Sequence, residues 1–320
     1  MTVRLNSLRS GIFTRRAHVD LFEDGEISTP LNHLTYKLYR PRRLARAPAL
    51  VVMLHGCTQT AEDFALGTDM NRYADRHGFI VIYPQQNLLA NMKRCWNWFD
   101  PRNQGQSGEA ATIMQIVDDV TLAHGLTAPR VFVAGLSAGG SLAAILGRAY
   151  PDRISAVGIH AGMPMASART VPGAFRAMEN GETGETGPGP TPAIIFQGDE
   201  DGTVAPANGD RIAFAPDARV RKQRLFSGWR WAVRHLIGAT DEHAAAEYWK
   251  VPGLGHDWSG GNAAGSHADP YGPRASREMV RFFFGYRRGA YPFVAAFAAL
   301  RPRRLRHKNI APVALPPHGA

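Results

Sequence analysis

Cysteine is scarce in this sequence. Only two occur among 320 residues, Cys57 and Cys95. A scaffold of several disulfides and a zinc site built from several cysteines are therefore excluded. Two alternatives remain for the pair itself: one disulfide bond, or two free thiols, as a reducing compartment would keep them. Both cysteines fall beside the residues that emerge below as candidates for an active site.

The sequence also lacks long hydrophobic runs. No segment approaches the roughly 18 consecutive apolar residues that span a bilayer. No sustained apolar run of the kind found in a secretory signal peptide precedes Leu21. A cytoplasmic location is therefore the default expectation. Hydrophobic residues nevertheless make up 44% of the chain, which is enough for a buried core.

Acidic residues are in the minority. The chain has 27 Asp and Glu against 37 Lys and Arg, which gives a formal net charge of +10. This balance would suit nucleic acid, an anionic surface or an acidic substrate, but no nucleic-acid-binding motif accompanies it. Much of the excess lies near the two ends of the chain. We expect no specific nucleic-acid partner, and at most a weak surface contact by the basic C-terminal tail.

The chain does contain a regular alternation of strand-like and helix-like segments. Strands are predicted at 33–41, 48–56, 79–84, 131–134, 154–159, 193–196 and 246–251, and helices at 62–77, 108–125 and 139–150. This order is typical of βαβ units and a largely parallel sheet, so the expected fold class is α/β.

Strands needed for one sheet occur on both sides of the Gly/Pro-rich segment 180–192, which is expected to be a mobile loop. We therefore predict a single domain over residues 33–286, an N-terminal extension at 1–32 and a basic tail at 287–320. The basic, Trp-bearing segment 219–237 is interpreted as a surface excursion, with an arm over the site as the alternative.

The segment 131–140 places a serine directly after an apolar strand. Gly135, Ser137 and Gly139 form the pattern G-x-S-x-G. Small residues around the serine let the chain turn sharply from strand to helix and leave the serine accessible at the turn. A short match of this kind also fits an ordinary Gly/Ser turn. Residues elsewhere in the chain must separate the two interpretations.

Two later turns offer the partners that a serine nucleophile needs. A base must take the hydroxyl proton, and a carboxylate must orient that base. Asp199, Glu200 and Asp201 follow the strand at 193–196, and His256 follows the strand at 246–251. Open α/β sheets gather catalytic groups at such strand ends, and the order serine, acid, histidine is that of α/β-hydrolases. The sequence therefore favours a serine hydrolase.

The oxyanion formed during attack on an ester needs two backbone N–H donors. Ala138 offers one directly after the serine. Cys57, next to Gly56 in the turn after an early strand, offers the second. An alternative nucleophile, the Cys57 thiol with His55 as its base, lacks an evident orienting partner in the sequence.

Several stretches resemble a known family, the polyhydroxybutyrate (PHB) depolymerase family of esterases within the α/β-hydrolases. The most specific are LHGCTQT at 54–60, CWNW at 95–98 and GHDWSGG at 255–261, and matching pieces cover most of residues 34–286. The resemblance implies an α/β-hydrolase fold with one mostly parallel central sheet and helices on both faces.

The same resemblance implies a role for individual residues. Ser137 would be the nucleophile and His256 the base. Asp201 would be the acid, because it occupies the acidic position of a G-x-x-D-x-x-V pattern, with Asp199 as the second candidate. No metal or organic cofactor is implied. Family members are often exported, so an extracellular or periplasmic location is the alternative to the cytoplasm.

Three tryptophans are also implicated by the resemblance. Trp96 and Trp98 are expected to line an acyl groove, and Trp258 to lie beside the histidine. Each of them would equally fit an ordinary aromatic core.

The predicted function is that of a serine esterase that cleaves short-chain acyl esters or hydroxyalkanoate oligomers, with a small ester or polyester oligomer as its partner. Three alternatives remain open. The first is an esterase for feruloyl groups or acetylated xylan. The second is a serine peptidase of the same fold. The third is a non-catalytic binding protein on a hydrolase scaffold that uses its basic termini.

Overall fold

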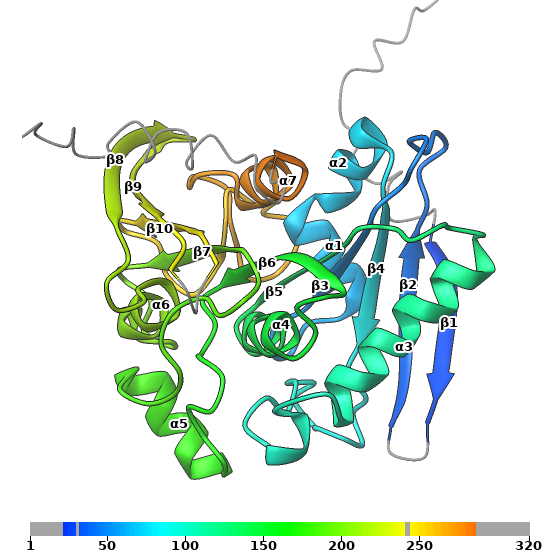
Figure 1. Ribbon diagram of the computed structural model, residues 1–320, viewed down its shortest axis with the longest axis horizontal. Coiled ribbons are helices and arrows are strands. Elements are labelled where there is room, and N and C mark those ends of the chain that lie inside the picture. Colours follow the sequence, from blue (N-terminus) through cyan, green and yellow to red (C-terminus); the bar gives the residue numbers. More distant parts are fainter. Residues whose placement is uncertain (1–21, 30–31, 241–243, 286–320) are drawn as a thin grey trace, which may run out of the picture.

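The computed structural model describes residues 22–29, 32–240 and 244–285, and its central feature is one large sheet (Figure 1). The strands of this sheet are β1 (Phe22–Ser28), β2 (His33–Tyr39), β3 (Leu50–Leu54), β4 (Ile80–Gln85), β5 (Val131–Leu136), β6 (Ile154–His160), β7 (Ala193–Gly198), β8 (Val220–Ser227), β9 (Arg230–Ile237) and β10 (Ala246–Val251). Their order across the sheet is β1-β2-β4-β3-β5-β6-β7-β10-β9-β8.

The helices connect these strands. They are α1 (Ala61–Thr68), α2 (Met70–His77), α3 (Gly108–Ala123), α4 (Ala138–Ala149), α5 (Val171–Asn180), α6 (Pro206–Ala213) and α7 (Ala275–Gly285), with a short 3-10 helix η1 (Pro101–Asn103). Two further short strands, β11 (Trp258–Ser259) and β12 (Ala268–Asp269), pair in parallel in the loop after β10.

The middle of the sheet is parallel. Strands β4, β3, β5, β6, β7 and β10 all run in the same direction, whereas the pairs at both edges are antiparallel. Every residue of β3, β5 and β7 is buried, as expected for strands covered by helices on both faces. The predicted α/β class is confirmed.

Helices cover the two faces of the sheet (Figure 1). Each face has its own apolar core. On one face, Leu50, Val52 and Leu54 of β3 share a cluster with residues of α3 and α4. On the other, Val51 and Met53 pack with residues of α1, α2 and α7. The alternation along β3 follows from the two-residue period of a strand.

The sheet extends further at both edges than the sequence predicted. Strand β1 lies within the expected extension 1–32 and pairs with β2 from Phe22 to Ser28, so the domain boundary at 33 is too late. The segment 219–237 is not a surface excursion, because β8 and β9 form a hairpin that pairs with β10. Both edges carry many charged residues, which hide the strand pattern.

The Gly/Pro-rich segment 180–192 is packed rather than loose, which corrects the expectation of a mobile loop. Arg148 donates to the carbonyl of Gly187 at 2.6 Å and forms an ion pair with Glu185. Arg211 donates to the carbonyl of Gly184 at 2.8 Å. Since these partners come from α4 and α6, the composition of the loop alone does not reveal them.

The predicted helix at 62–77 is two helices. Asp69 lies between α1 and α2 with a φ of 54°, a left-handed conformation that interrupts helical hydrogen bonding.

Within the part of the chain that the structure describes, no helix is long and apolar enough to cross a membrane. The expected surface contact of the tail 287–320 concerns residues outside the described ranges.

The packing of α7 on the sheet yields a test of the fold. The ring of Phe283 is fully buried and stacks on Phe132 of β5 at 4.8 Å between centroids. Replacing Phe283 with Ala leaves a cavity, so we expect the free energy of unfolding to fall by about 3–5 kcal/mol. Denaturant unfolding measures this. Leu122→Ala, at a side chain that is 84% exposed, is the control and should change stability by less than about 0.5 kcal/mol.

Candidate active site

Ser137 occupies a strained turn between β5 and α4. Its φ and ψ are 57° and −119°, a conformation that non-glycine residues rarely adopt. The turn is held from both sides: the Ser137 N–H donates to the carbonyl of His160 at 2.9 Å, and the Ser137 carbonyl accepts from the Ser141 N–H at 2.9 Å. Such over-determined strain at a strand-to-helix turn is characteristic of a nucleophile elbow.

The two glycines of the motif are required by space. A Cβ on Gly135 would lie 2.3 Å from the carbonyl carbon of Gly139. A Cβ on Gly139 would lie 2.1 Å from the carbonyl oxygen of Leu54 at the end of β3. Both approaches are far shorter than van der Waals contact, so the spacing G-x-S-x-G lets the elbow sit directly against the neighbouring strand.

A histidine and a carboxylate meet close to this turn. His256 Nδ1 lies 2.8 Å from Asp201 Oδ2. Asp201 follows β7 and His256 follows β10, and these two strands pair in parallel. The pairing therefore brings together two side chains that are 55 residues apart in the sequence.

Asp201 is embedded in further hydrogen bonds. Its Oδ1 accepts from the backbone N–H groups of Thr203 and Val204 at 2.9 and 2.8 Å, and its Oδ2 accepts from the Gln197 amide at 3.1 Å. Burial alone would raise the pKa of Asp201. The hydrogen bond and charge of His256, together with the two N–H donors, outweigh it, so the pKa is lowered. The carboxylate is thus held ionised behind the imidazole.

A cavity of about 420 Å³ opens over this site, and Ser137 and His256 both line it. In the described part of the chain no hydrogen bond joins these two side chains, a contact that often tightens only when substrate binds. The other walls come from the turn at 56–59, the loop at 91–99 and helix α5, and they are mostly apolar. The cavity is thus suited to an apolar group attached next to the reacting atom.

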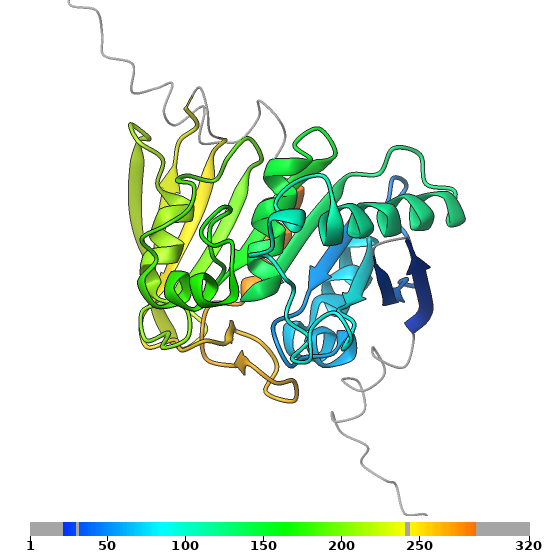
Figure 2. The same ribbon diagram turned by 90° about the horizontal axis from the view of Figure 1, so that it is seen from below.

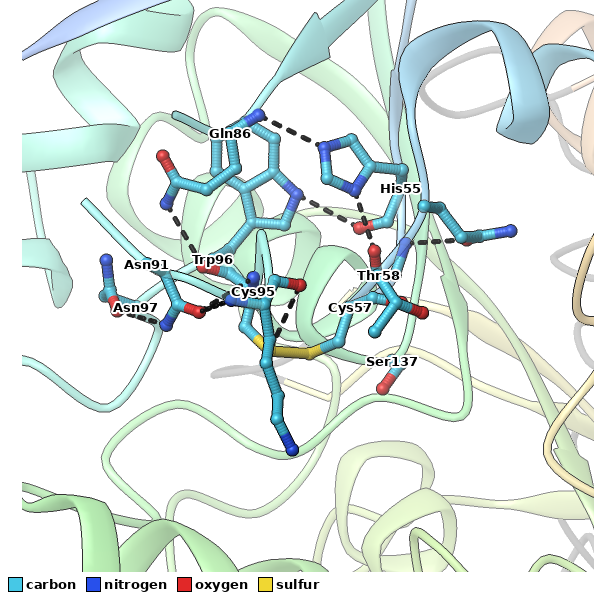
Figure 3. The surroundings of a disulfide bond; sticks show 12 residues. His55, Cys57, Thr58, Gln86, Asn91, Cys95, Trp96, Asn97 and Ser137 are labelled. Atoms are coloured by element: carbon cyan, nitrogen blue, oxygen red, sulfur yellow. Dashed lines mark hydrogen bonds between the residues drawn. A yellow bond between two sulfur atoms is a disulfide. The ribbon is translucent and has the colours of Figure 1, made fainter. Parts of the chain in front are cut away.

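A disulfide bond joins Cys57 to Cys95 in the cavity wall. It links the turn after β3 to the 91–99 loop, and Figure 3 shows Ser137 beside it. Of the two alternatives for the cysteines, the structure contains the disulfide. Because the Cys57 sulfur is in this bond, the alternative of a Cys57 nucleophile is excluded.

His55 fixes the backbone of the same turn. Its Nδ1–H donates to the carbonyl of Gly56 at 2.7 Å, and its Nε2 accepts from the N–H of Gln86 at 3.1 Å (Figure 3). Burial lowers the pKa of His55 to about 4, so the ring is neutral at ordinary pH. Its carbonyl accepts from the indole N–H of Trp96 at 3.0 Å. The two ring nitrogens and the carbonyl of His55 thus all take part in hydrogen bonds that fix this turn.

Of the three tryptophans implicated by sequence, the structure brings two to the cavity. Trp96 and Trp98 are among its lining residues. Trp258 is not: its ring packs against Phe64 and His160, and its indole N–H donates to Ser276 at 3.0 Å. Trp258, expected beside the histidine as a substrate contact, is instead buried in the aromatic core, which was the alternative for each tryptophan.

Helix α5 contributes a wall that sequence reasoning missed. Val171, Ala174, Phe175 and Met178 all line the cavity. They recur at the i, i+3, i+4, i+7 spacing of one helix face. Phe175 and Val171 are more than half exposed, although both are apolar. This spacing, directly after the capping residue Thr170, is the signal that could have identified them.

Glu109 was also missed, because nothing in its sequence context marks it as buried. It lies in the first turn of α3 and accepts hydrogen bonds from the Gln86 side chain at 2.6 Å and from the N–H and side chain of Asn97 at 2.8 Å each. Glu109 therefore anchors the loop that carries Trp96 and Trp98.

The sequence matches a known protein family. The family model described as "Esterase PHB depolymerase" matches residues 34–216. Poly(3-hydroxyalkanoate) depolymerase C of Paucimonas lemoignei is 39% identical over 180 residues, 51% of this chain and 43% of that protein. Feruloyl esterase B of Neurospora crassa is 36% identical over 138 residues, 42% of this chain and 46% of that protein. The chain thus spans less than half the length of these curated relatives.

Among solved structures, the acetyl xylan esterase from Aspergillus awamori has a TM-score of 0.59 at 18% identity, over 73% of this chain and 94% of that one. This likeness shows the α/β-hydrolase fold. Since the family match extends over residues 34–216, more than half of the sequence, the chain belongs to the esterase PHB depolymerase family.

Proposed function

We propose that this chain is a serine carboxylic-ester hydrolase that cleaves short-chain acyl esters or hydroxyalkanoate oligomers through an acyl-enzyme on Ser137. One observation carries the proposal: a strained serine turn and a hydrogen-bonded His256–Asp201 pair open onto the same apolar cavity. The relatives named above, a poly(3-hydroxyalkanoate) depolymerase and a feruloyl esterase, support ester chemistry.

The reaction proceeds in two acyl-transfer steps. His256 Nε2 takes the proton of Ser137 Oγ as this oxygen attacks the ester carbonyl carbon, and the same proton passes to the departing alcohol. Water then attacks the acyl-enzyme, His256 again accepting and returning the proton. Asp201, hydrogen-bonded to Nδ1, fixes the tautomer that leaves Nε2 free to act as the base and stabilises the imidazolium that forms.

The N–H groups of Cys57 and Ala138 are proposed to hold the oxyanion. Cys57 lines the cavity beside Ser137, and Ala138 begins α4. Among the described residues neither N–H donates to a protein acceptor. Both are therefore available to a developing negative charge, and their position is fixed by the elbow and the disulfide.

Asp201 rather than Asp199 is proposed as the acid. Asp201 bonds His256, whereas Asp199 Oδ1 accepts from the N–H of Gly253 at 2.7 Å and so supports the turn before the histidine.

A second candidate substrate class is the aromatic or acetyl ester carried by plant polysaccharides. The observation that favours it is the set of aromatic rings around the cavity: Trp98, Phe99 and Phe175 all line it. Such rings suit a planar acyl group as well as a short aliphatic one.

The disulfide bears on location. Structural disulfides persist in oxidising compartments and are rare in the cytosol. The Cys57–Cys95 bond therefore supports an extracellular or periplasmic protein over the cytoplasmic default.

Substitutions in the proposed triad test the function. We expect Ser137→Ala and Asp201→Asn each to lower kcat on p-nitrophenyl butyrate by at least about 10³-fold, since the nucleophile is lost in one and the tautomer is no longer fixed in the other. Hydroxybutyrate oligomers and methyl ferulate, measured alongside, separate the two substrate classes. A peptide amide series should show no turnover.

The matched control is Asp199→Asn, which keeps the acceptor oxygen for Gly253 and should change kcat by less than about tenfold. Full activity of Ser137→Ala, or a larger loss in Asp199→Asn than in Asp201→Asn, would contradict the proposed assignment.

Glu109 makes stability depend on pH. Burial raises its pKa from 4.5 to about 7 in the folded protein, despite the three hydrogen bonds that favour the charged form. Between these values the unfolded chain loses the proton and the folded one keeps it, so stability decreases as pH rises. Relative to Glu109→Gln, the wild type should lose about 3 kcal/mol of unfolding free energy from pH 4.5 to 7 and nothing further above it.

Denaturant unfolding of both proteins between pH 4 and 9 measures that difference. A difference that stays constant over this range would show that Glu109 keeps an ordinary pKa.

A further inference from the structure

The β8–β9 hairpin presents an unusual surface. Four aromatic side chains at its end and on the adjoining loop are 49% to 78% exposed, although large apolar groups are normally covered. Three exposed basic residues lie on the same hairpin. We call this surface the hairpin patch; it consists of Phe226, Trp229, Trp231, Tyr271, Arg221, Lys222 and Arg224.

The charge of the hairpin has one sign. Residues 218–240 include six Lys and Arg and no Asp or Glu. Arg230 and Arg234 have acidic partners elsewhere in the fold. Arg221 and Lys222 form no ion pair in the described part of the chain, and the Arg224 guanidinium lies 4.6 Å from the centre of the Trp231 ring. The patch therefore combines aromatic rings with unneutralised positive charge.

Two basic side chains and two aromatic rings lie on one face of the hairpin. Lys222, Arg224 and Phe226 are two residues apart along β8 and so point to the same side. Trp231 stands opposite Phe226 in the register and shares that side. The Phe226 and Trp231 rings contact each other, and the Arg224 guanidinium lies over the Trp231 ring, so basic groups border the aromatic pair directly.

The hairpin is fixed to the loop that carries the proposed catalytic base. The Trp229 N–H donates to the carbonyl of Tyr271 at 2.8 Å. Gly228, with a φ of 68°, approaches Gly272 so closely that a Cβ would lie 2.3 Å from its carbonyl oxygen. Arg230 contacts Asp269 and the Gly253 carbonyl on either side of His256.

Strand β9 is antiparallel to β10, so its start lies next to the end of β10 from which the His256 loop departs. Figure 2 shows that loop, in orange, at the lower edge of the molecule. The aromatic end of the patch thus lies at the same edge of the sheet as the cavity, whereas Arg221 and Lys222 lie further along the hairpin, in register with the start of β10.

The positive charge of the hairpin patch indicates which kind of molecule binds there. A second copy of the patch would bring like charges together, and the segment 286–320 of this chain contains no acidic residue, so neither complements it. The complement is an extended anion with flat apolar faces. Sugar rings stack on exposed Trp and Tyr, and uronate carboxylates pair with Arg and Lys.

We propose that the hairpin patch binds an anionic polysaccharide, a chain of sugars that includes uronic acids. Binding at this surface goes beyond the proposed hydrolysis and does not require it. Because its aromatic end lies at the same edge of the sheet as the cavity, the patch would hold the protein on a polymer while Ser137 acts on esters within reach.

Affinity electrophoresis of the full chain tests this proposal. Its migration is measured in gels that contain glucuronoxylan or neutral dextran, at 50 and 300 mM NaCl. We expect retardation by glucuronoxylan only, weaker at high salt. The double variant Trp229→Ala/Trp231→Ala and the triple variant Arg221→Gln/Lys222→Gln/Arg224→Gln should each weaken it at least tenfold. Leu122→Ala, an exposed apolar residue on α3, is the matched control and should bind as the wild type does.

Hydrolysis of p-nitrophenyl butyrate by the same variants should equal that of the wild type, which shows that they fold. Ser137→Ala should bind glucuronoxylan as the wild type does, because binding does not require hydrolysis. This variant therefore separates a failure of the binding proposal from a failure of the proposed function. Three results would overturn the proposal: no retardation by glucuronoxylan, retardation that the hairpin variants leave unchanged, or tighter binding to single-stranded DNA or phosphatidylglycerol vesicles than to the polysaccharide.

Discussion

The site depends on the contact between the start of α4 and the end of β3. A side chain on Gly139 would collide with the carbonyl of Leu54, so only glycine lets helix and strand meet at this distance. The contact brings the turn after β3 against the turn that carries Ser137. Cys57 and Ser137, which belong to different βα units, consequently line one cavity. Their relative position follows from backbone packing, which is stiffer than any arrangement of flexible side chains.

Buried polar side chains next to this contact fix the turn after β3 and the 91–99 loop through hydrogen bonds. His55, Gln86 and Glu109 are all buried, and each has hydrogen-bond partners in the turn after β3 or in the 91–99 loop. Leaving one such group without its partner costs about 1–3 kcal/mol, so the loop is specified by its hydrogen bonds as well as by its contacts. The Cys57–Cys95 disulfide adds a covalent link between the same two segments. A cavity wall made of loop residues can thereby be as well ordered as one made of helix.

The sequence predicts the centre of the fold far better than its edges. Buried parallel strands are continuous apolar runs, and the turns after them carry the candidate site residues, so β5, Ser137 and His256 could be located without coordinates. Strand β8 could not, because its exposed face reads as a run of charged residues. The loop 180–192 has the composition of a mobile segment, yet long-range contacts to Arg148 and Arg211 hold it. Such contacts leave no local pattern.

The part of the chain beyond the family match completes the site. The match ends at residue 216, after Asp201 but before His256. Pairing of β10 with β7 aligns Val251 with Gly198, which brings the turns carrying these two side chains together. Strand β10 would be an unprotected sheet edge if β9 did not pair with its other side. In this chain the hairpin therefore also has a structural role, because it protects the edge of the strand that leads to His256. That requirement constrains its backbone and the inward side chains, and it leaves the residues on the exposed face free to serve recognition.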